Sequence, residues 1–315
     1  MGHDVPLQQA PQTAPAEKQW DGRTRSGLGI YVMFLLFKWV GPLFAYFVLY
    51  PVCFFYLVVA GSHRRASLDY LKRRFPQVGA VKRRWYVYRH FLSFGRVLLD
   101  RAYAYLGWLE NMKFEHKGLD VIQKTLDEGK GLILLSAHLG NWELSAHALG
   151  KLGLNHRRVP INIVMFEGDG ERVKGYLKRC SNDQPFNVIA SNDSLQASID
   201  ALAALRRGEI VGLLGDRHLG QGCVDVPFLG GTAALASGPF VLAANSGAPV
   251  MFTFANRAGS RHYVLDAQGP RQYKFGSRKT RDHDLKKWAT EYAQMLEEKL
   301  KMHPFQWHNF FTFWK

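Results

Sequence analysis

Short apolar runs alternate with stretches of helical periodicity through much of the chain. The runs are "GLILLSAH", "INIVMF", "NVIAS", "EIVGLLGD" and "APVMFTFA", the first of them beginning at Gly131. After the capping sequence "SNDS", apolar side chains recur at helical spacing, namely Leu195, Ile199, Leu202 and Leu205. Continuous apolar strands separated by helices are typical of a parallel sheet that is covered on both faces. The pattern therefore predicts an α/β fold with a mostly parallel sheet flanked by helices.

A last amphipathic stretch runs from about Asp282 to Met302. Its apolar side chains fall on one helical face, namely Leu285, Trp288, Tyr292 and Leu296. The chain then ends with the aromatic sequence "PFQWHNFFTFW". Packing against the core explains this tail as well as contact with lipid does, because large aromatic side chains are usually buried.

The sequence "WVGPLFAYFVLYPVCFFYLVVAG", residues 39–61, contains 23 residues without a charged side chain. As a helix it would be about 34 Å long, which is enough to cross the hydrocarbon core of a bilayer. We therefore expect an N-terminal membrane helix. Pro42 and Pro51 can kink such a helix, and Lys38 separates it from a shorter apolar run, so a re-entrant or interfacial helical pair stays open.

Composition divides the chain into three segments. Residues 1–22 are rich in proline, glutamine and alanine without an apolar period, which is typical of a disordered lead. Residues 23–61 form the expected membrane-anchoring segment. Residues 62–315 form one large domain, for which a content of 47% hydrophobic residues supplies a sizeable core.

Positive charge is concentrated directly after the apolar segment. Of a net charge of +15, residues 61–90 contribute +8, because they hold nine Lys or Arg side chains and a single acid, Asp69. Basic residues flanking a membrane segment favour the cytoplasmic side, where they also face anionic lipid headgroups. A solvated basic surface is the alternative interpretation, and we expect no nucleic-acid partner.

Several classes of site are disfavoured by the absence of their motifs. The chain has no nucleophile elbow G-x-S-x-G, no Walker loop and no G-x-G-x-x-G, which argues against serine hydrolases, P-loop proteins and dinucleotide binders. His138, Glu143 and His147 lack the H-E-x-x-H spacing, so we expect neither a metal nor another cofactor. Cys53, Cys180 and the third cysteine, Cys223, share no metal spacing and fit a reducing compartment.

The sequence "SAHLGNWELSAH", residues 136–147, holds the strongest candidate chemistry. In a single helix His138 and Glu143 would lie about 140° from a common face, so helical periodicity cannot bring them together. A strand that ends at His138, a turn at Gly140 and a helix capped by Asn141 would let Glu143 fold back toward the imidazole. A histidine oriented by a carboxylate is suited to general acid and base catalysis.

A wider set of motifs resembles one known family. "SAHLGNWE", "INIVM", "GDRHLG" and "VPFLGGTAALASGPFVLAANSGAPV" occur in this order, together with the lead "WDGRTRSG" and the sequence "RRASLDYLKRRF". This order is similar to the bacterial lipid A secondary (late) acyltransferase family of the lysophospholipid acyltransferase superfamily, which carries a His-x4-Asp/Glu motif. The resemblance covers most of the chain and is closest to a branch with "GDR" after the fourth apolar run.

The resemblance implies transfer of an acyl group from a thioester to a hydroxyl of a lipid acceptor. The expected donor is acyl carrier protein or acyl-CoA, and the expected location is the cytoplasmic face of the inner membrane, with residues 62–315 as the acyltransferase domain. His138 and Glu143 would be the catalytic dyad and Asp216 a later essential acid, while a family arginine matches Arg179 only loosely.

Two further residues have more than one interpretation. Arg217 would bind a phosphate or carboxylate, or support the oxyanion of the tetrahedral intermediate, but it could equally form an ion pair that fixes Asp216. Asn141 would contact the substrate or serve only as the cap of its helix.

Other functions stay open at the level of sequence. The acceptor could be a lysophospholipid, an amino-acid lipid or a polyene lipid instead of a lipid A-like molecule. A rival of a different class is a membrane-tethered, non-enzymatic binder of polyanions. That rival would explain the basic segment but not the histidine and glutamate at the strand end.

Overall fold

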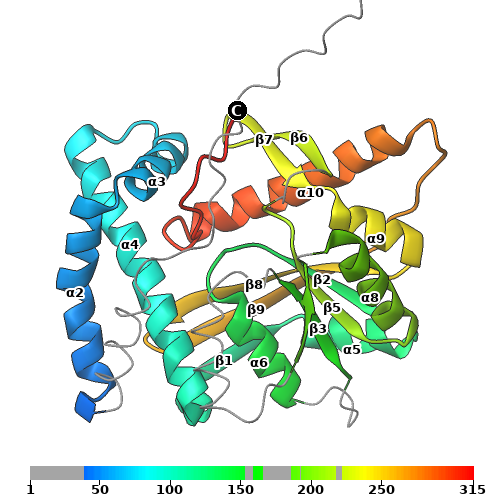
Figure 1. Ribbon diagram of the computed structural model, residues 1–315, viewed down its shortest axis with the longest axis horizontal. Helices are drawn as coiled ribbons and strands as arrows, with labels where there is room; N and C mark the ends of the chain where they lie inside the picture. The colour runs from blue at the N-terminus through cyan, green and yellow to red at the C-terminus, as the bar shows by residue number, and fades with distance from the viewer. Residues whose placement is uncertain (1–38, 153–158, 166–185, 192, 218–221) are drawn as a thin grey trace, which may run out of the picture.

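A seven-stranded sheet with helices on both faces forms the centre of the protein in the computed structural model (Figure 1). The structure describes residues 39–152, 159–165, 186–191, 193–217 and 222–315. The predictions of a disordered lead over 1–22 and of a role for Arg179 lie outside these residues. The strands are β1 (Lys113–Lys117), β2 (Leu132–Ser136), β3 (Ile161–Met165), β4 (Asn187–Ala190), β5 (Ile210–Leu214), β8 (Val250–Gly259) and β9 (His262–Arg271).

The order of the strands is β1-β9-β8-β2-β5-β3-β4, and every pair is parallel except β8 with β9. The prediction of a mostly parallel sheet is therefore confirmed, and all five apolar runs quoted above form strands of it. Sequence reasoning did not identify β1 and β9, nor the separate antiparallel hairpin of β6 (Cys223–Phe228) and β7 (Gly231–Ala236). The edge strand β1 has a mostly charged sequence, "KFEHK", that no apolar pattern marks.

Helices cover both faces of the sheet. They are α2 (Pro42–Val59), α3 (Gly61–Arg74), α4 (Ala80–Tyr103), α5 (Leu119–Asp127), α6 (Trp142–Leu152), α8 (Ser194–Arg206), α9 (Gly238–Ser246) and α10 (Arg281–Met302). Helix α2 packs on α4 along one edge of the molecule. Alternate side chains of β2 point to opposite faces: Ile133 and Leu135 pack in the cluster that contains α8, α9 and α10, whereas Leu132 packs with α5 and α6. Helix α10 matches the predicted last helix within one residue.

The C-terminal aromatic tail packs against the core. Trp307 is fully buried, and Phe313 and Trp314 are almost so. Trp314 stacks on Phe228 of the β6–β7 hairpin and donates from its indole nitrogen to the Phe228 carbonyl oxygen over 2.9 Å. Packing is thus the interpretation of the tail that the structure supports for these three side chains.

The N-terminal apolar segment differs from the predicted single membrane helix. Within the described residues no single helix is long and apolar enough to cross a membrane; only α2 and α3 together pass by length and composition, and they are bent by 94° at the break between them. The break lies at Ala60, and the 14 residues that follow form the strongly basic α3. The apolar run therefore ends where the chain bends out of α2, whose inner side chains Ala45, Leu49 and Cys53 are buried.

A buried polar network joins this N-terminal helix to the sheet. Asp100 of α4 is fully buried and accepts hydrogen bonds from Tyr46 of α2, from Arg257 of β8 at 2.7 Å and from Tyr263 of β9 at 2.6 Å. A buried carboxylate is tolerated when it is paired and hydrogen-bonded in this way. Helices α2 and α4 lie side by side along one edge of the molecule as a result (Figure 1).

A buried histidine gives the fold a dependence on pH. His90 lies between the Ser67 hydroxyl at 2.8 Å and the Trp307 carbonyl at 2.7 Å. Burial lowers the pKa of His90 to about 4, although the hydrogen bond to Trp307 opposes this shift. Burial likewise holds the pKa of neighbouring His308 well below its usual value. Both imidazoles thus stay neutral where the unfolded chain already binds protons.

The midpoint temperature of unfolding is expected to fall as the pH drops from about 6.5 toward 4. When folding lowers the pKa of a histidine, the unfolded chain binds the proton first, so acid favours the unfolded state. The lowered pKa of His90 alone reduces the free energy of unfolding by about 3 kcal/mol at pH 4, compared with its value above pH 6.5. The variant His90→Gln should be less stable at pH 7.5 but should lose less stability on acidification. Differential scanning fluorimetry at several pH values measures both effects, and equal slopes for the two proteins would contradict this account.

Candidate active site

The strand end after β2 places His138 at the carboxyl edge of the sheet. The next residues turn sharply at Gly140, whose φ of +68° favours glycine, and a Cβ atom there would overlap the carbonyl oxygen of Ala255. The Gly140 and Asn141 backbone nitrogens donate to the carbonyl oxygens of Gln306 and Ala255, each over 2.8 Å. The turn predicted at Gly140 is therefore present and is held by strand β8 and by the C-terminal segment.

Asn141 begins helix α6. Its side-chain oxygen accepts from the Leu144 backbone nitrogen over 3.4 Å, and its amide nitrogen donates to the Val97 carbonyl over 3.3 Å. The side chain is fully buried. These contacts are those of an N-cap that also ties α6 to α4. They support the interpretation of Asn141 as the cap of its helix.

Asp216 is the carboxylate that orients His138. The Nδ1 atom of His138 donates to Asp216 Oδ1 over 2.8 Å, and the His138 backbone nitrogen and the Trp307 indole nitrogen donate to Oδ2 over 3.0 and 2.8 Å. Burial acts to raise the pKa of Asp216, but the charge and hydrogen bonds of His138 outweigh it and lower that pKa to about 2. Asp216 is therefore ionised at neutral pH and can only accept.

This contact fixes the tautomer of the imidazole. Because an ionised Asp216 accepts at Oδ1, the Nδ1 atom of His138 must carry a proton, and the lone pair of the neutral ring is left on Nε2. The His138 side chain is 21% exposed, whereas that of Asp216 is fully buried. The arrangement places a basic nitrogen on a partly exposed side chain and buries the carboxylate that supports it.

Glu143 lies in the first turn of α6, as expected, but the structure gives the hydrogen bond of His138 Nδ1 to Asp216. Glu143 Oε2 instead forms an ion pair with Arg101 of α4 at 2.9 Å, and the carboxylate is 9% exposed. His138 meets Asp216 because of the strand register. In the adjacent parallel strands β2 and β5, Ser136 pairs with Leu214, so the residues two positions further along each strand lie together at the sheet edge. The carboxylate at Nδ1 is thus that of Asp216, and the fold-back of Glu143 toward the imidazole stays a prediction.

Arg217 contacts the C-terminal segment. Its Nη2 atom donates to the His308 carbonyl oxygen over 2.9 Å, and its guanidinium carbon lies 5.0 Å from the centre of the Phe311 ring. The positive charge of Arg217 contributes to lowering the pKa of Asp216, after the larger effects of burial and His138. One donor of the Arg217 guanidinium is thus used by the His308 carbonyl oxygen, whereas the sequence suggested Asp216 or a substrate as the partner.

Two functional neighbours escaped the sequence reasoning, Arg101 and the segment around Trp307. The His308 backbone nitrogen donates to the His138 carbonyl over 2.8 Å, and Leu139 pairs with Trp307 in an antiparallel bridge. The tail therefore forms one wall of the site, with the Trp307 indole on Asp216. The aromatic sequence "PFQWHNFFTFW" was the only signal, and it did not reveal a hydrogen-bonding role.

The site is built from protein side chains without a metal cluster among the described residues. No group of three His, Cys, Asp or Glu side chains in that part of the chain is placed to hold a metal ion. His147, which has a place in the candidate motif, is buried and packs edge-on against Phe186 at 5.0 Å between ring centres.

A comparison with known families matches almost the whole chain. The family of bacterial lipid A biosynthesis acyltransferases matches residues 24–315, a range that contains every site residue described above. No curated protein matches the chain in a sequence comparison.

Proposed function

The chain belongs to the bacterial lipid A biosynthesis acyltransferase family, and on that premise we propose that it transfers a fatty acyl group from an acyl thioester to a hydroxyl of a lipid A-like acceptor. The observation that carries the proposal is the hydrogen bond from His138 Nδ1 to the buried Asp216 carboxylate, which leaves Nε2 as the base. The donor is acyl carrier protein or acyl-CoA, and no cofactor is required for this reaction.

The reaction needs a proton acceptor because a hydroxyl group is a weak nucleophile near neutral pH. His138 Nε2 takes the hydroxyl proton as the acceptor oxygen attacks the thioester carbonyl, and the ring becomes positively charged. Asp216 stabilises that charge through Nδ1. The tetrahedral intermediate then expels the thiolate, which receives the proton from Nε2, so the ester and the free thiol are formed and the imidazole is neutral again.

Glu143 supports the site through Arg101 in this proposal. Both Arg101 and His138 are close enough to His308 to affect its pKa. The ion pair of Glu143 with Arg101 links the first turn of α6 to α4 and thereby fixes the position of the turn that carries His138. Glu143 is thus a positioning residue, with Arg101 as the residue that it holds.

Purified protein, an acyl carrier protein thioester and an acceptor panel test the proposal directly. Release of free carrier thiol, together with the mass of the acylated lipid, identifies both the activity and the acceptor. Lysophospholipid, amino-acid lipid and polyene lipid belong in the panel as alternative acceptors. If neither the carrier thioester nor acyl-CoA releases thiol with any acceptor, the non-enzymatic binder of polyanions becomes the better interpretation.

Arg217→Lys is expected to lower acyl transfer by about tenfold or more and to change the unfolding temperature little. Lysine keeps the charge but loses the planar guanidinium that can bind His308 and an oxyanion or phosphate together. Arg261→Lys is the matched control, because Arg261 also stacks at 5.0 Å on an aromatic ring, Tyr103, and donates to its hydroxyl. A destabilised Arg217→Lys protein, with a loss not additive with that of Asp216→Asn, would assign Arg217 a structural role.

We further propose that α2 and the basic segment hold the protein on the cytoplasmic side of the inner membrane. The outward face of α2 exposes large apolar side chains, among them Leu43, Phe47 and Phe55, which are 83%, 72% and 60% exposed. Exposed apolar surface of this extent marks a membrane or protein contact, and the adjacent basic segment favours anionic lipid.

The triple change of Leu43, Phe47 and Phe55 to serine is expected to release the protein from sedimented membranes at high salt. The three side chains lie on the surface, so the midpoint of unfolding should stay within a few degrees of the wild-type value. Under low salt the basic segment should still retain part of the protein, since its attraction to anionic lipid is screened only by added ions. Retention of the triple variant at high salt would place the apolar attachment elsewhere.

A further inference from the structure

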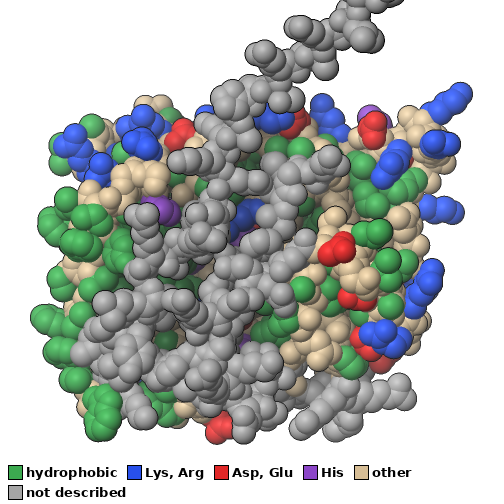
Figure 2. Space-filling view, viewed as in Figure 1, with side chains coloured by type: hydrophobic (Ala, Val, Ile, Leu, Met, Phe, Trp, Pro, Cys, Tyr) green, Lys and Arg blue, Asp and Glu red, His purple; other side chains and the backbone are tan. Residues whose placement is uncertain are grey.

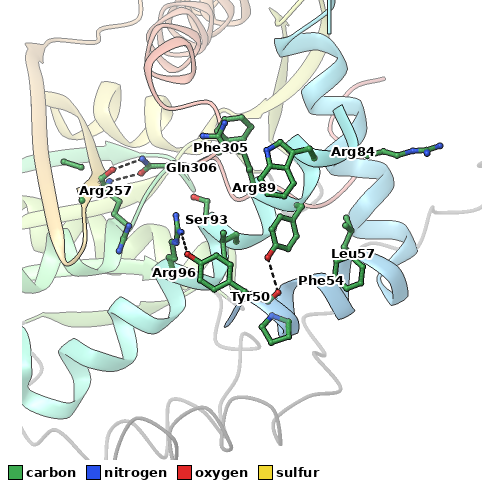
Figure 3. Close-up of a pocket in the computed structure, with 16 residues that line it drawn as sticks. Tyr50, Phe54, Leu57, Arg84, Arg89, Ser93, Arg96, Arg257, Phe305 and Gln306 are labelled. Carbon is green, nitrogen blue, oxygen red and sulfur yellow. Dashed lines mark hydrogen bonds between the residues drawn. The ribbon is translucent and has the colours of Figure 1, made fainter. Parts of the chain in front are cut away.

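A groove of about 1000 Å³ runs between α2 and α4, apart from the candidate active site (Figure 3). Its α4 wall is a helical stripe, and the members of that stripe are Arg84, Trp85, Tyr88, Arg89, Leu92, Ser93 and Arg96. The α2 wall consists of Tyr50, Pro51, Phe54 and Leu57. Residues 257–259 at the end of β8 and residues 305–306 close the remaining side. The volume is that of a typical binding pocket for a small organic molecule.

The groove combines an apolar lining with arginine side chains. No Asp or Glu is among the described residues that line it. Arg96 donates to the Tyr50 hydroxyl over 3.1 Å, and Arg89 stacks 4.1 Å over Phe305. Neither guanidinium forms an ion pair with a carboxylate of the described residues. Arg257 differs, because Asp100 neutralises it. Arg84 extends away from the middle of the groove (Figure 3).

The surroundings of the groove favour lipid as its occupant. The exposed face of α2 continues from the groove, and Phe54, which lines it, is 61% exposed. Figure 2 shows hydrophobic side chains along the edge that α2 forms, with Lys and Arg side chains gathered above them. An apolar slot with cationic groups beside a lipid-facing helix matches an amphiphile with an acyl chain and an anionic headgroup.

The groove is separate from the catalytic histidine. None of His138, Glu143 and Asp216 lines it. Arg96 and Arg101 are five residues apart on α4, so they point in directions about 140° apart around the helix axis, and it is Arg101 that pairs with Glu143. The same helix thus offers one side to the active site and another side to the groove.

We propose that this groove binds one anionic phospholipid of the membrane as a bound, unreacted lipid. The headgroup phosphate lies against the guanidinium groups of Arg89 and Arg96, and one acyl chain lies along Pro51, Phe54 and Leu92. Arginine suits the phosphate because its planar group can donate two hydrogen bonds at once. The bound lipid fills the space between α2 and α4 and so fixes α2 against the domain at the membrane surface.

Native mass spectrometry of the full-length protein tests this site. Delipidated protein in detergent is titrated with phosphatidylglycerol and, separately, with zwitterionic phosphatidylcholine of the same chain length. The wild type should retain one phosphatidylglycerol per chain in preference to phosphatidylcholine. The double variant Arg89→Gln/Arg96→Gln should bind phosphatidylglycerol at least about tenfold more weakly. The reason is that each cation near a phosphate contributes on the order of 1 kcal/mol.

Two single variants separate the groove from general charge. Arg84→Gln removes one charge from the same helix but from a side chain that points away, so it should retain the lipid. Ala258→Trp keeps every charge and fills the groove from the exposed end of β8, so it should lose the lipid. Equal weakening by Arg84→Gln, wild-type binding by Ala258→Trp, or equal binding of phosphatidylcholine would each overturn the proposal.

The identity of the occupant is decided by two further measurements. If acyl carrier protein, rather than lipid, loses affinity in the double variant, the arginines form a protein-docking surface. If phosphatidylglycerol competes with the acceptor in acyl transfer, the groove belongs to the acceptor site. Either result overturns a separate lipid site, whereas lipid retention can be measured even when no acyl transfer occurs, so failure of the proposed function would not affect this test.

Discussion

His138→Ala is expected to lower the rate of acyl transfer by about 10²- to 10⁴-fold, the usual loss when a general base is removed. The protein should remain folded, because the buried Asp216 carboxylate keeps two of its donors, the backbone nitrogen of residue 138 and the Trp307 indole. The side chain that is lost is partly exposed and leaves no large cavity. Thiol release from the carrier thioester measures the activity, and the unfolding temperature reports on the fold.

His262→Ala is the matched control for this result. His262 is 25% exposed and also contacts a carboxylate, Glu115, at 3.0 Å, but that carboxylate is 44% exposed and lies at the β1 edge of the sheet. A loss caused only by removing a surface histidine paired with an acid would appear in both variants. Near-normal turnover by folded His138→Ala protein would instead exclude His138 as the base.

Local sequence patterns predicted the parts of the fold that depend on neighbouring residues. The strand at 132–136 and the helix after Asn141 follow from an apolar run, a positive-φ glycine and a capping side chain, all within ten residues. The placement of His138 and Asp216 at strand ends was also predictable. Their direct contact required the strand order, because only adjacency of β2 and β5 brings both ends together.

Contacts between distant segments could not be predicted in this way. Trp307 lies 91 residues after Asp216, and Arg101 precedes Glu143 by more than a strand and a helix. No periodicity specifies which helix face or tail will cover a given sheet edge. The N-terminal helix shows the same limit: its apolar composition was evident, but its packing on α4 depends on Asp100, Arg257 and Tyr263, which come from three separate elements.

Asp216→Asn is expected to lower acyl transfer by about 10⁴-fold, as the same change does in serine proteases, while costing about 1 to 3 kcal/mol of stability. The backbone nitrogen of His138 and the Trp307 indole both donate to Oδ2, and neither can become an acceptor. The asparagine oxygen must therefore face these two donors, and its NH₂ group must face Nδ1. The imidazole can satisfy that contact only by moving its proton to Nε2, which removes the base.

Glu143→Gln is the control for Asp216→Asn. It tests whether activity is lost because the tautomer of His138 changes or because any nearby carboxylate charge is removed. It weakens the ion pair with Arg101 but leaves the hydrogen bond between Nδ1 and Asp216 in place, so the tautomer of His138 should not change. Nitrogen NMR of the labelled imidazole distinguishes the two states, and transfer by Glu143→Gln should fall much less than transfer by Asp216→Asn. A larger loss in Glu143→Gln, with a proton on Nε2, would make Glu143 the orienting acid. Asp216 would then serve only to accept hydrogen bonds from the buried backbone nitrogen of His138 and the Trp307 indole.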